Sequence, residues 1–214
     1  MSRATLIYAL DPLCGWCFAF ADTAAALRRA LGDQVDWRIA CGGLVTGDRV
    51  RPIADMAGYL RSGMRTVETR TSARFGAAFG AVLDEGRWVS DSEPGCRATL
   101  VVQEGWGGGA AVDFAGALAR GFYGAGRLPD DPASVAWAAE QVGLEAEPVL
   151  SRWDTEAARR LTQEAFRSAR AEGMTSYPTL YRRLPGEQAT VVLPGWAPPT
   201  QALAAVRGAL PAPS

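Results

Sequence analysis

The hydrophobic pattern at the start of the chain predicts a β-α-β unit. Residues 5–10 form a short apolar run of the kind found in buried strands. Apolar residues then recur at helical spacing as far as Leu31, and Gly32 is a typical helix end. Residues 35–41 alternate apolar and polar side chains, which is typical of a half-buried strand, and two glycines follow them. We therefore expect the unit to be complete by about residue 43.

The middle of the chain, from about residue 48 to 173, has helical patterning and few strand-like segments. Glycine and proline break its alanine- and arginine-rich stretches, and Ser92 and Pro94 indicate a helix start at which Ser92 is a candidate cap. We expect the glycines at 107–109 to form a loop. The pattern predicts helices over residues 52–64, 66–82, 94–105, 110–122, 132–141 and 154–172.

The last part of the chain returns to a strand pattern. Residues 179–182 and 189–193, separated by a Pro-Gly turn, predict a hairpin, and residues 200–210 predict a closing amphipathic helix. The predicted fold class is α/β, in the order β-α-β, long helical insert, β-β-α. The expected domains are 1–45 together with 174–214, and an inserted all-helical domain at 46–173.

Composition and charge exclude several classes of function. The chain has 214 residues, a formal net charge of −1 and a sequence pI near 5.6, so it lacks the basic field that favours nucleic-acid binding. No apolar run reaches the ~18–20 residues that span a bilayer, and residues 1–4 lead into the first strand without a hydrophobic leader. We expect a soluble, cytoplasmic protein that binds neither nucleic acid nor membrane.

The absent residue types narrow the chemistry further. All 22 basic residues are arginine, and the chain contains no lysine, histidine or asparagine. Serine–histidine and cysteine–histidine hydrolysis, Schiff-base chemistry, the P-loop lysine and imidazole metal sites all need one of these residues. Thiol chemistry is the plausible class that remains.

Cys14-Gly15-Trp16-Cys17 places two cysteines where the first strand gives way to the first helix. Such a pair can interconvert between dithiol and disulfide, and a reducing compartment favours a catalytic pair over a structural disulfide. The free N–H groups and the positive dipole end of a helix N-terminus favour the thiolate, which is the nucleophile. We therefore predict that Cys14 attacks and that Cys17, one turn further along, resolves.

A metal site and an inert pair are the alternatives for these two cysteines. A zinc site needs about four nitrogen or sulfur ligands, and only Cys41 and Cys96 remain, each alone in sequence. We therefore predict no metal. Cys41 is expected to be a small buried residue, with a second redox pair as the alternative, and Cys96 a packing residue at a helix start, with an approach to the substrate as the alternative.

The order of elements, with C-x-x-C opening the first helix, resembles the thioredoxin superfamily, and the long helical insert resembles its DsbA-like branch, closest to FrnE-like members. A second marker is the segment Gly-Met-Thr-Ser-Tyr-Pro-Thr-Leu at residues 173–180, which is similar to the family's cis-proline loop before a strand. The resemblance implies that Tyr177 and Pro178 lie against the cysteine pair and bind substrate through the backbone. Gly15 and Trp16, between the two cysteines, are further candidate substrate-binding residues, with an aromatic lid over the disulfide as the alternative for Trp16.

The resemblance implies a thiol:disulfide oxidoreductase that forms a mixed disulfide through Cys14 and resolves it through Cys17. Its substrate would be a thiol or disulfide in a peptide, a protein or glutathione. No cofactor is expected beyond the redox-active disulfide, with glutathione as a candidate co-substrate. Because Gly15-Trp16 lacks the histidine of strongly oxidising DsbA proteins, we expect a less oxidising couple.

The sequence is also compatible with two other functions. One is a glutathione-dependent isomerase or transferase related to 2-hydroxychromene-2-carboxylate isomerase, although that branch typically has serine at the position of Cys14. The other is a non-catalytic peptide-binding or chaperone-like protein.

Met56, Met64 and Trp88 are expected in the core, with an apolar groove as the alternative. The expected solvated charged face consists of Arg61, Arg65, Arg70 and Arg74.

Overall fold

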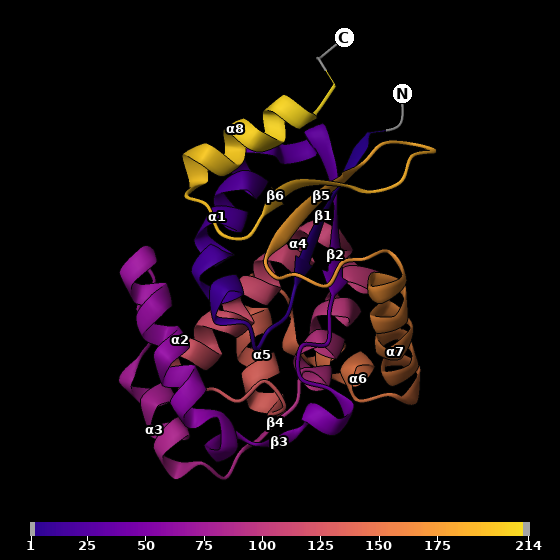
Figure 1. Cartoon of the computed structure of the whole chain (residues 1–214). Helices are drawn as coiled ribbons and strands as arrows, with labels where there is room; N and C mark the ends of the chain where they lie inside the picture. Colours follow the sequence, from indigo (N-terminus) through magenta and orange to yellow (C-terminus); the bar gives the residue numbers. More distant parts are fainter. Residues whose placement is uncertain (1–2, 212–214) are drawn as a thin grey trace.

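A four-stranded sheet built from the two ends of the chain forms the centre of the computed structural model, which describes residues 3–211 (Figure 1). The strand order is β2 (Val35–Cys41), β1 (Ala4–Leu10), β5 (Thr179–Arg183), β6 (Thr190–Pro194). β1 pairs in parallel with β2 and antiparallel with β5, and β5 pairs antiparallel with β6. The predicted α/β class, the first two strands and the hairpin are therefore confirmed.

Helices from both ends of the chain and from the insert cover the sheet. α1 (Gly15–Leu31) packs against α8 (Pro199–Ala209), while α4 (Glu93–Ala125) and α7 (Glu156–Ala171) both contact β2 (Figure 1). The remaining elements are η1 (Gly32–Gln34), η2 (Gly47–Arg49), β3 (Arg51–Pro52), η3 (Ile53–Met56), α2 (Ala57–Arg70), α3 (Ala77–Glu85), β4 (Val89–Ser90), α5 (Pro132–Gln141) and α6 (Ala146–Trp153).

The central strand β1 is buried on both faces, and its side chains alternate between two cores. Leu6 and Tyr8 pack into the larger core with Phe20 of α1, where the Tyr8 and Phe20 ring centroids lie 5.4 Å apart. Ile7 faces the opposite side and packs with Ala169 of α7. Burial on both faces explains why this strand is a continuous apolar run, whereas β2 alternates buried and exposed positions.

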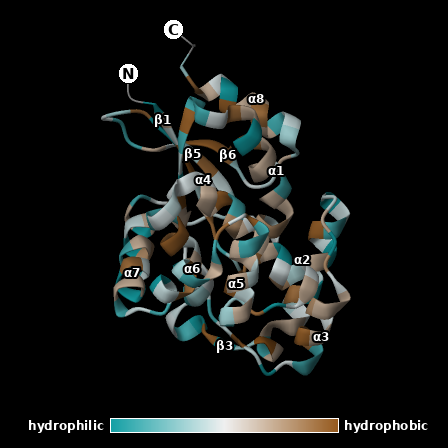
Figure 2. Cartoon of the chain, turned by 180° about the vertical axis from the view of Figure 1, so that it is seen from behind, coloured by the Kyte–Doolittle hydropathy of each residue, from teal (hydrophilic) through white to brown (hydrophobic). Residues whose placement is uncertain are grey.

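α7 is a polar helix held by one narrow apolar face. Its buried residues recur every three or four positions, at Ala158, Thr162, Phe166 and Ala169. Hydrophilic residues occupy much of the rest of the helix (Figure 2). Within residues 3–211, no helix is both long and apolar enough to cross a bilayer.

The predicted helix at 66–82 is wrong, because a break at residues 71–76 separates α2 from α3. Thr71 is extended, with φ −139° and ψ 174°. Gly76 lies so close to α4 that an added Cβ would be 1.9 Å from the Gly124 oxygen. Contact with α4, which the local pattern does not reveal, therefore sets the start of α3. The sequence pattern also failed to predict α6.

The glycines at 107–109 lie inside α4 rather than in the expected loop. Only Gly107 leaves helical geometry, with φ 86° and ψ 165°. A Cβ on Gly108 would lie 1.7 Å from the Trp37 carbonyl oxygen, and one on Gly109 would lie 2.0 Å from Arg28 Nη1. Gly108 and Gly109 let α4 approach β2 and α1 closely, and the two helices predicted on either side of these glycines are separated by a kink at Gly107 instead of a loop.

The insert and the sheet pack through the same helix. α4 contacts both β2 and α1, and α7 also contacts β2. The division of the chain into domains at about residues 45 and 173 stays a prediction. What the packing shows is that the helix following the C-x-x-C motif is supported on one side by the insert.

Gly108→Ala should destabilise the fold, because the new methyl group would meet the Trp37 carbonyl, a backbone atom that cannot move aside easily. We expect a loss of about 1–3 kcal/mol in the free energy of unfolding, measured by urea denaturation. The matched control is Gly208→Ala in α8, which has open space around the added methyl group and should be neutral or stabilising by up to about 1 kcal/mol. Equal effects of the two substitutions would contradict the close packing.

Candidate active site

The cysteine pair lies at the start of α1, where the sequence predicts it. Cys14 is the N-cap residue, with φ −92° and ψ 111°, and the Cys14 N–H donates to the Asp11 carbonyl at 3.0 Å. The Cys14 carbonyl accepts from the backbone N–H groups of Cys17 at 2.9 Å and Phe18 at 3.1 Å. Cys14 therefore precedes the first turn, whose free N–H groups favour an anion at its thiol, and Cys17 lies within that turn.

Both thiols are free and largely buried, but their surroundings shift the two pKa values in opposite directions. A hydrogen bond from the Cys17 thiol lowers the pKa of Cys14, assisted by the N–H groups of Cys17 and Trp16 and opposed by burial and by the charge of Asp11. Burial raises the pKa of Cys17 well above its ordinary value, and the hydrogen bond to Cys14 acts in the same direction. As the pH rises, Cys14 therefore ionises before Cys17, which stays protonated.

The loop before β5 lies against Cys14. The Tyr177–Pro178 peptide bond is cis, and the Cys14 thiol donates a hydrogen bond to the Tyr177 carbonyl over an Sγ–O distance of 3.5 Å. The Pro178 carbonyl accepts from the Gly195 N–H at 2.8 Å, which ties the same loop to the end of β6. Residues 163 positions apart in sequence therefore meet at one sulfur atom.

Gly42 holds Tyr177 in this position, although the sequence pattern indicated only that Gly42 ends a strand. A Cβ on Gly42 would lie 1.8 Å from Tyr177 Cζ, so the ring lies directly over the glycine backbone. The Tyr177 hydroxyl donates to the Met174 carbonyl at 3.1 Å. Because Gly42 has no side chain, the Tyr177 ring can lie against its backbone. This position of Tyr177 places its carbonyl oxygen beside Cys14.

Asp11 is fully buried behind the cysteine pair and joins three segments of the chain. Its carboxylate accepts from the backbone N–H groups of Leu13 at 2.9 Å and Leu44 at 2.7 Å. It also accepts from Ser92 Oγ at 2.8 Å and from the Cys96 thiol at 3.8 Å. Burial raises the pKa of Asp11, and these hydrogen bonds oppose that shift. The residue fixes the turn before Cys14 to the loop after β2 and to the start of α4.

The expected capping role of Ser92 is wrong in its side-chain detail. Ser92 is the N-cap residue of α4, but its hydroxyl makes no cap hydrogen bond. It donates to Asp11 and accepts from the Val45 N–H at 2.9 Å instead. Asp91 Oδ1 accepts from the Glu93 N–H at 2.9 Å near the helix start. The Ser92 hydroxyl therefore binds the buried Asp11 carboxylate instead of capping α4, which is the role that the local sequence predicts.

Cys41 and Cys96 are fully buried and contact each other's segments. Cys41 donates to the Cys96 carbonyl at 3.8 Å, and burial raises the pKa of Cys96 well above its ordinary value. Arg97 is also buried and pairs with Glu93 over 3.2 Å. Cys41 is the small buried residue that was expected, and Cys96 and Arg97 do not line the cavity beside Cys14.

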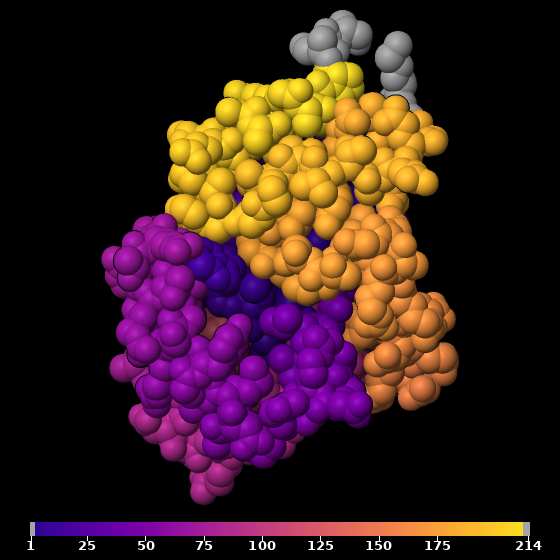
Figure 3. Space-filling model, in the orientation of Figure 1, coloured from indigo at the N-terminus to yellow at the C-terminus, as the bar shows by residue number. Residues whose placement is uncertain are grey.

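A cavity of about 480 Å³ opens beside Cys14, and Gly15 and Trp16 form part of its wall. Tyr123 of α4 also lines it and donates through its hydroxyl to the Leu13 carbonyl at 2.6 Å. The space-filling view shows indigo atoms of the first segment at the bottom of a hollow bordered by purple atoms of the insert (Figure 3). Further apolar wall residues come from α2, α3 and the segment between them and include Leu60, Met64, Val67, Phe75 and Phe79.

The apolar residues singled out in the insert divide between the cavity and the core. Met56 and Met64 line the cavity, so the groove alternative describes them better than the expected core position. Trp88 packs against Phe122 with ring centroids 5.2 Å apart and donates to Asp130 at 2.9 Å, away from Cys14. Two of the four arginines predicted to form a solvated face make hydrogen bonds within the protein surface. Arg61 binds Asp84, and Arg74 binds backbone carbonyls at the break between α2 and α3.

Solved structures with the same fold include disulfide oxidoreductases. No protein-family model and no curated protein matches the chain. The cytosolic disulfide reductase DsbM from Pseudomonas aeruginosa is 25% identical, with a TM-score of 0.77 over 96% of this chain and 98% of that one. A proposed protein disulfide isomerase from Nitrosomonas europaea is 20% identical, with a TM-score of 0.79 over 97% of both chains. The chain therefore has the DsbA-like thioredoxin fold of these proteins.

More distant solved structures share the fold alone. Oxidoreductase DsbA from Xylella fastidiosa is 12% identical, with a TM-score of 0.55 over 96% of this chain and 83% of that one. A 2-hydroxychromene-2-carboxylate isomerase is 15% identical, with a TM-score of 0.55 over 96% of this chain and 93% of that one. The isomerase alternative is therefore no better supported than the oxidoreductase.

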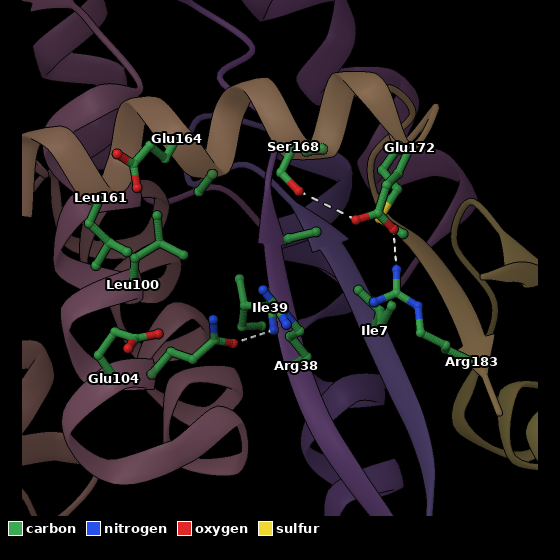
Figure 4. Close-up of a pocket in the computed structure, with 15 residues that line it drawn as sticks. Ile7, Arg38, Ile39, Leu100, Glu104, Leu161, Glu164, Ser168, Glu172 and Arg183 are labelled. Atoms are coloured by element: carbon green, nitrogen blue, oxygen red, sulfur yellow. Dashed lines mark hydrogen bonds and ion pairs between the residues drawn. The ribbon is translucent and has the colours of Figure 1, made fainter. Parts of the chain in front are cut away.

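A second cavity of the protein, of about 220 Å³, lies between β2, α4 and α7 and contains none of the predicted site residues (Figure 4). Three of its polar side chains bind one another, and a fourth binds the backbone of β2. Glu172 accepts from Ser168 Oγ at 3.3 Å and pairs with Arg183, and Gln103 accepts from the Ile39 N–H at 2.6 Å. Within residues 3–211, no group of three or more cysteine or carboxylate side chains is arranged to hold a metal ion.

Alkylation of the reduced protein by iodoacetamide should modify Cys14 first. The thiolate is the reacting form, so the rate should rise with pH and reach half its maximum below the ordinary cysteine pKa of about 8.5, because the Cys14 pKa is lowered. Mass mapping of the labelled peptides across a pH series measures this, and Cys14→Ala is the control that should lose the fast phase. Faster labelling of Cys17 would reverse the roles of the two thiols.

Proposed function

We propose that this protein catalyses thiol–disulfide exchange, with Cys14 as the attacking thiol and Cys17 as the resolving thiol. The observation that carries the proposal is the placement of Cys14 before the first turn of α1, with its sulfur 3.5 Å from the Tyr177 carbonyl and at the wall of a cavity. The DsbA-like oxidoreductases among the matched structures support the same class of enzyme.

The exchange proceeds in two balanced steps. The Cys14 thiolate attacks one sulfur of a substrate disulfide, whose S–S bond breaks, and the second sulfur leaves as a thiolate. Cys17 then loses its proton and attacks the Cys14 sulfur, which releases the first half of the substrate and leaves a Cys14–Cys17 disulfide. The substrate gains two electrons and the protein loses two. The reverse sequence oxidises a dithiol substrate.

The different surroundings of the two thiols support this order. Cys14 ionises first because the hydrogen bond from Cys17 and the backbone N–H groups favour its thiolate. Cys17 is fully buried, so it keeps its proton until the mixed disulfide removes the charge on Cys14, which is one of the causes of its raised pKa. Formation of the mixed disulfide thus favours ionisation of Cys17 and starts the second step.

Substrate is held on two sides of Cys14 in this proposal. The Tyr177 carbonyl faces the sulfur from the loop before β5, and Pro178 continues that loop. Gly15 and Trp16 line the cavity on the side of α1. A peptide, a protein segment or glutathione would bind through backbone hydrogen bonds at the first side and through side-chain contacts at the second.

Glutathione is the proposed low-molecular-weight thiol of the reaction, and the proposed location is the cytoplasm. DsbM has been solved with GSH, and that structure matches this chain with 25% identity and a TM-score of 0.74 over 96% of this chain and 98% of that one. DsbM is named as a cytosolic disulfide reductase. No cofactor beyond the redox-active pair is needed for the two exchange steps.

Trapping by the two single-cysteine variants should be asymmetric. Cys17→Ala keeps the attacking sulfur and lacks the resolving one, so it should accumulate a mixed disulfide with glutathione after treatment with oxidised glutathione. Cys14→Ala should accumulate little, because the remaining Cys17 is buried and its pKa is raised. Intact-mass measurement gives the adduct directly, and equal trapping by both variants would rule out the assigned roles.

A further inference from the structure

The cavity beside Cys14 combines an apolar wall with two arginine side chains. Its lining is aromatic and aliphatic for the most part and contains no aspartate or glutamate, whereas Arg49 and Arg51 both contribute to it. The two arginines lie between β2 and α2, Arg49 in η2 and Arg51 in β3, and so come from a different segment than α1, which carries the thiols. The cavity therefore offers positive charge next to apolar surface within reach of the reacting sulfur.

Neither of these arginines is neutralised by the protein. Arg49 donates to the Gly43 carbonyl at 3.1 Å, and Arg51 donates to the carbonyls of Arg49 and Asp48, each at 3.1 Å. Among residues 3–211, no carboxylate lies within ion-pair distance of either guanidinium. A guanidinium has five N–H donors, so these backbone bonds orient both groups and leave donors free for an anion.

Exposed apolar side chains extend the cavity wall outward. Tyr59 is 74% exposed and Leu44 is 36% exposed, and both line the cavity. They are two of the four large apolar residues that the described part of the chain exposes. Apolar groups left in water beside a cavity are typical of a surface that a ligand covers.

We propose that this cavity selects disulfide substrates in which an aromatic or branched aliphatic group carries a carboxylate. The apolar group packs on the cavity wall, the anion pairs with Arg49 and Arg51, and the substrate sulfur lies at Cys14. A volume of about 480 Å³ suits a small organic group rather than a folded partner. The proposal deepens the thiol–disulfide exchange proposed above and rests on it.

The reaction that reports on this selection is the first exchange step. The Cys14 thiolate attacks one sulfur of the probe disulfide, the probe S–S bond breaks, and one thiolate leaves. The absorbance of that thiolate measures the reaction of the two aromatic probes, and the mass of the Cys14 adduct measures the reaction of dithiodiglycolate. The other half stays on Cys14 as a mixed disulfide until Cys17 displaces it. The protein loses two electrons over both steps, and each probe disulfide yields two thiolates.

Three disulfides separate the contributions of charge and apolar surface. 5,5′-Dithiobis(2-nitrobenzoate) carries both an aromatic ring and a carboxylate on each half, 4,4′-dithiodipyridine is aromatic and neutral, and dithiodiglycolate is anionic without a ring. Each rate constant with the reduced protein is divided by the rate constant of glutathione with the same probe, which removes intrinsic reactivity. We expect the largest normalised rate with the nitrobenzoate.

The variant Arg49→Gln/Arg51→Gln should lower the normalised rate with the nitrobenzoate by about tenfold or more, because two charge-assisted contacts are lost. Its rate with dithiodipyridine should change by less than about twofold, which also shows that the protein is folded and that Cys14 is intact. The matched control, Arg65→Gln/Arg70→Gln, removes two exposed arginines of α2 that do not line the cavity and should leave both rates unchanged.

The outcomes separate this inference from the function on which it rests. If Cys14 reacts with all three disulfides at similar normalised rates, or if both double variants slow the nitrobenzoate equally, the cavity does not select anionic apolar groups, and exchange at Cys14 still stands. If none of the disulfides modifies Cys14, as judged by a Cys14→Ala variant that behaves like the unchanged protein, the proposed exchange activity itself is wrong.

Discussion

The pairing of β1 with strands on both of its sides is the constraint on which the site depends. β1 is parallel to β2 and antiparallel to β5, so the turn after its last residue lies beside the loop that precedes β5. That register brings Cys14 to the Tyr177 carbonyl across 163 residues of sequence. Because the strand is buried on both faces, its position is fixed by packing as well as by hydrogen bonds. A thiol on a mobile loop would lack this fixed partner.

Asp11 extends the same constraint into the insert. Its buried carboxylate accepts hydrogen bonds from the Leu44 N–H and from Ser92 Oγ, and so fixes the two ends of the segment that carries α2 and α3 to the turn before Cys14. A buried carboxylate is costly unless such donors satisfy it, which explains why burial raises its pKa while the hydrogen bonds oppose the shift. The cavity beside Cys14 therefore has its walls set by the same residue that shapes the thiol turn.

Local patterns predict the sheet and the cysteine motif, because a period of two, a helical period and a C-x-x-C pair are all visible within a few residues. The insert is harder to predict. The break between α2 and α3 depends on the approach of Gly76 to α4. Gly108 and Gly109 serve close packing against Trp37 and Arg28, and only Gly107 interrupts the helix. At the site, Gly42, Arg49 and Arg51 escaped prediction because their roles come from tertiary neighbours. The Gly42-Gly43 doublet was the only local signal, and it indicated a strand end.

In the proposed function, Cys14 and Cys17 form a reversible redox couple whose reduction potential is set by the start of α1 and by Asp11. Equilibration of the protein with a series of glutathione redox buffers, followed by mass analysis of the peptide carrying both cysteines, measures this most directly. We expect a two-electron transition between dithiol and Cys14–Cys17 disulfide at a potential well below about −120 mV, because no imidazolium favours the thiolate while burial and Asp11 oppose it. A peptide that remains a dithiol at every buffer ratio would show that the two cysteines form no redox couple, and a couple as oxidising as about −120 mV would show that the start of α1 and Asp11 do not set its potential.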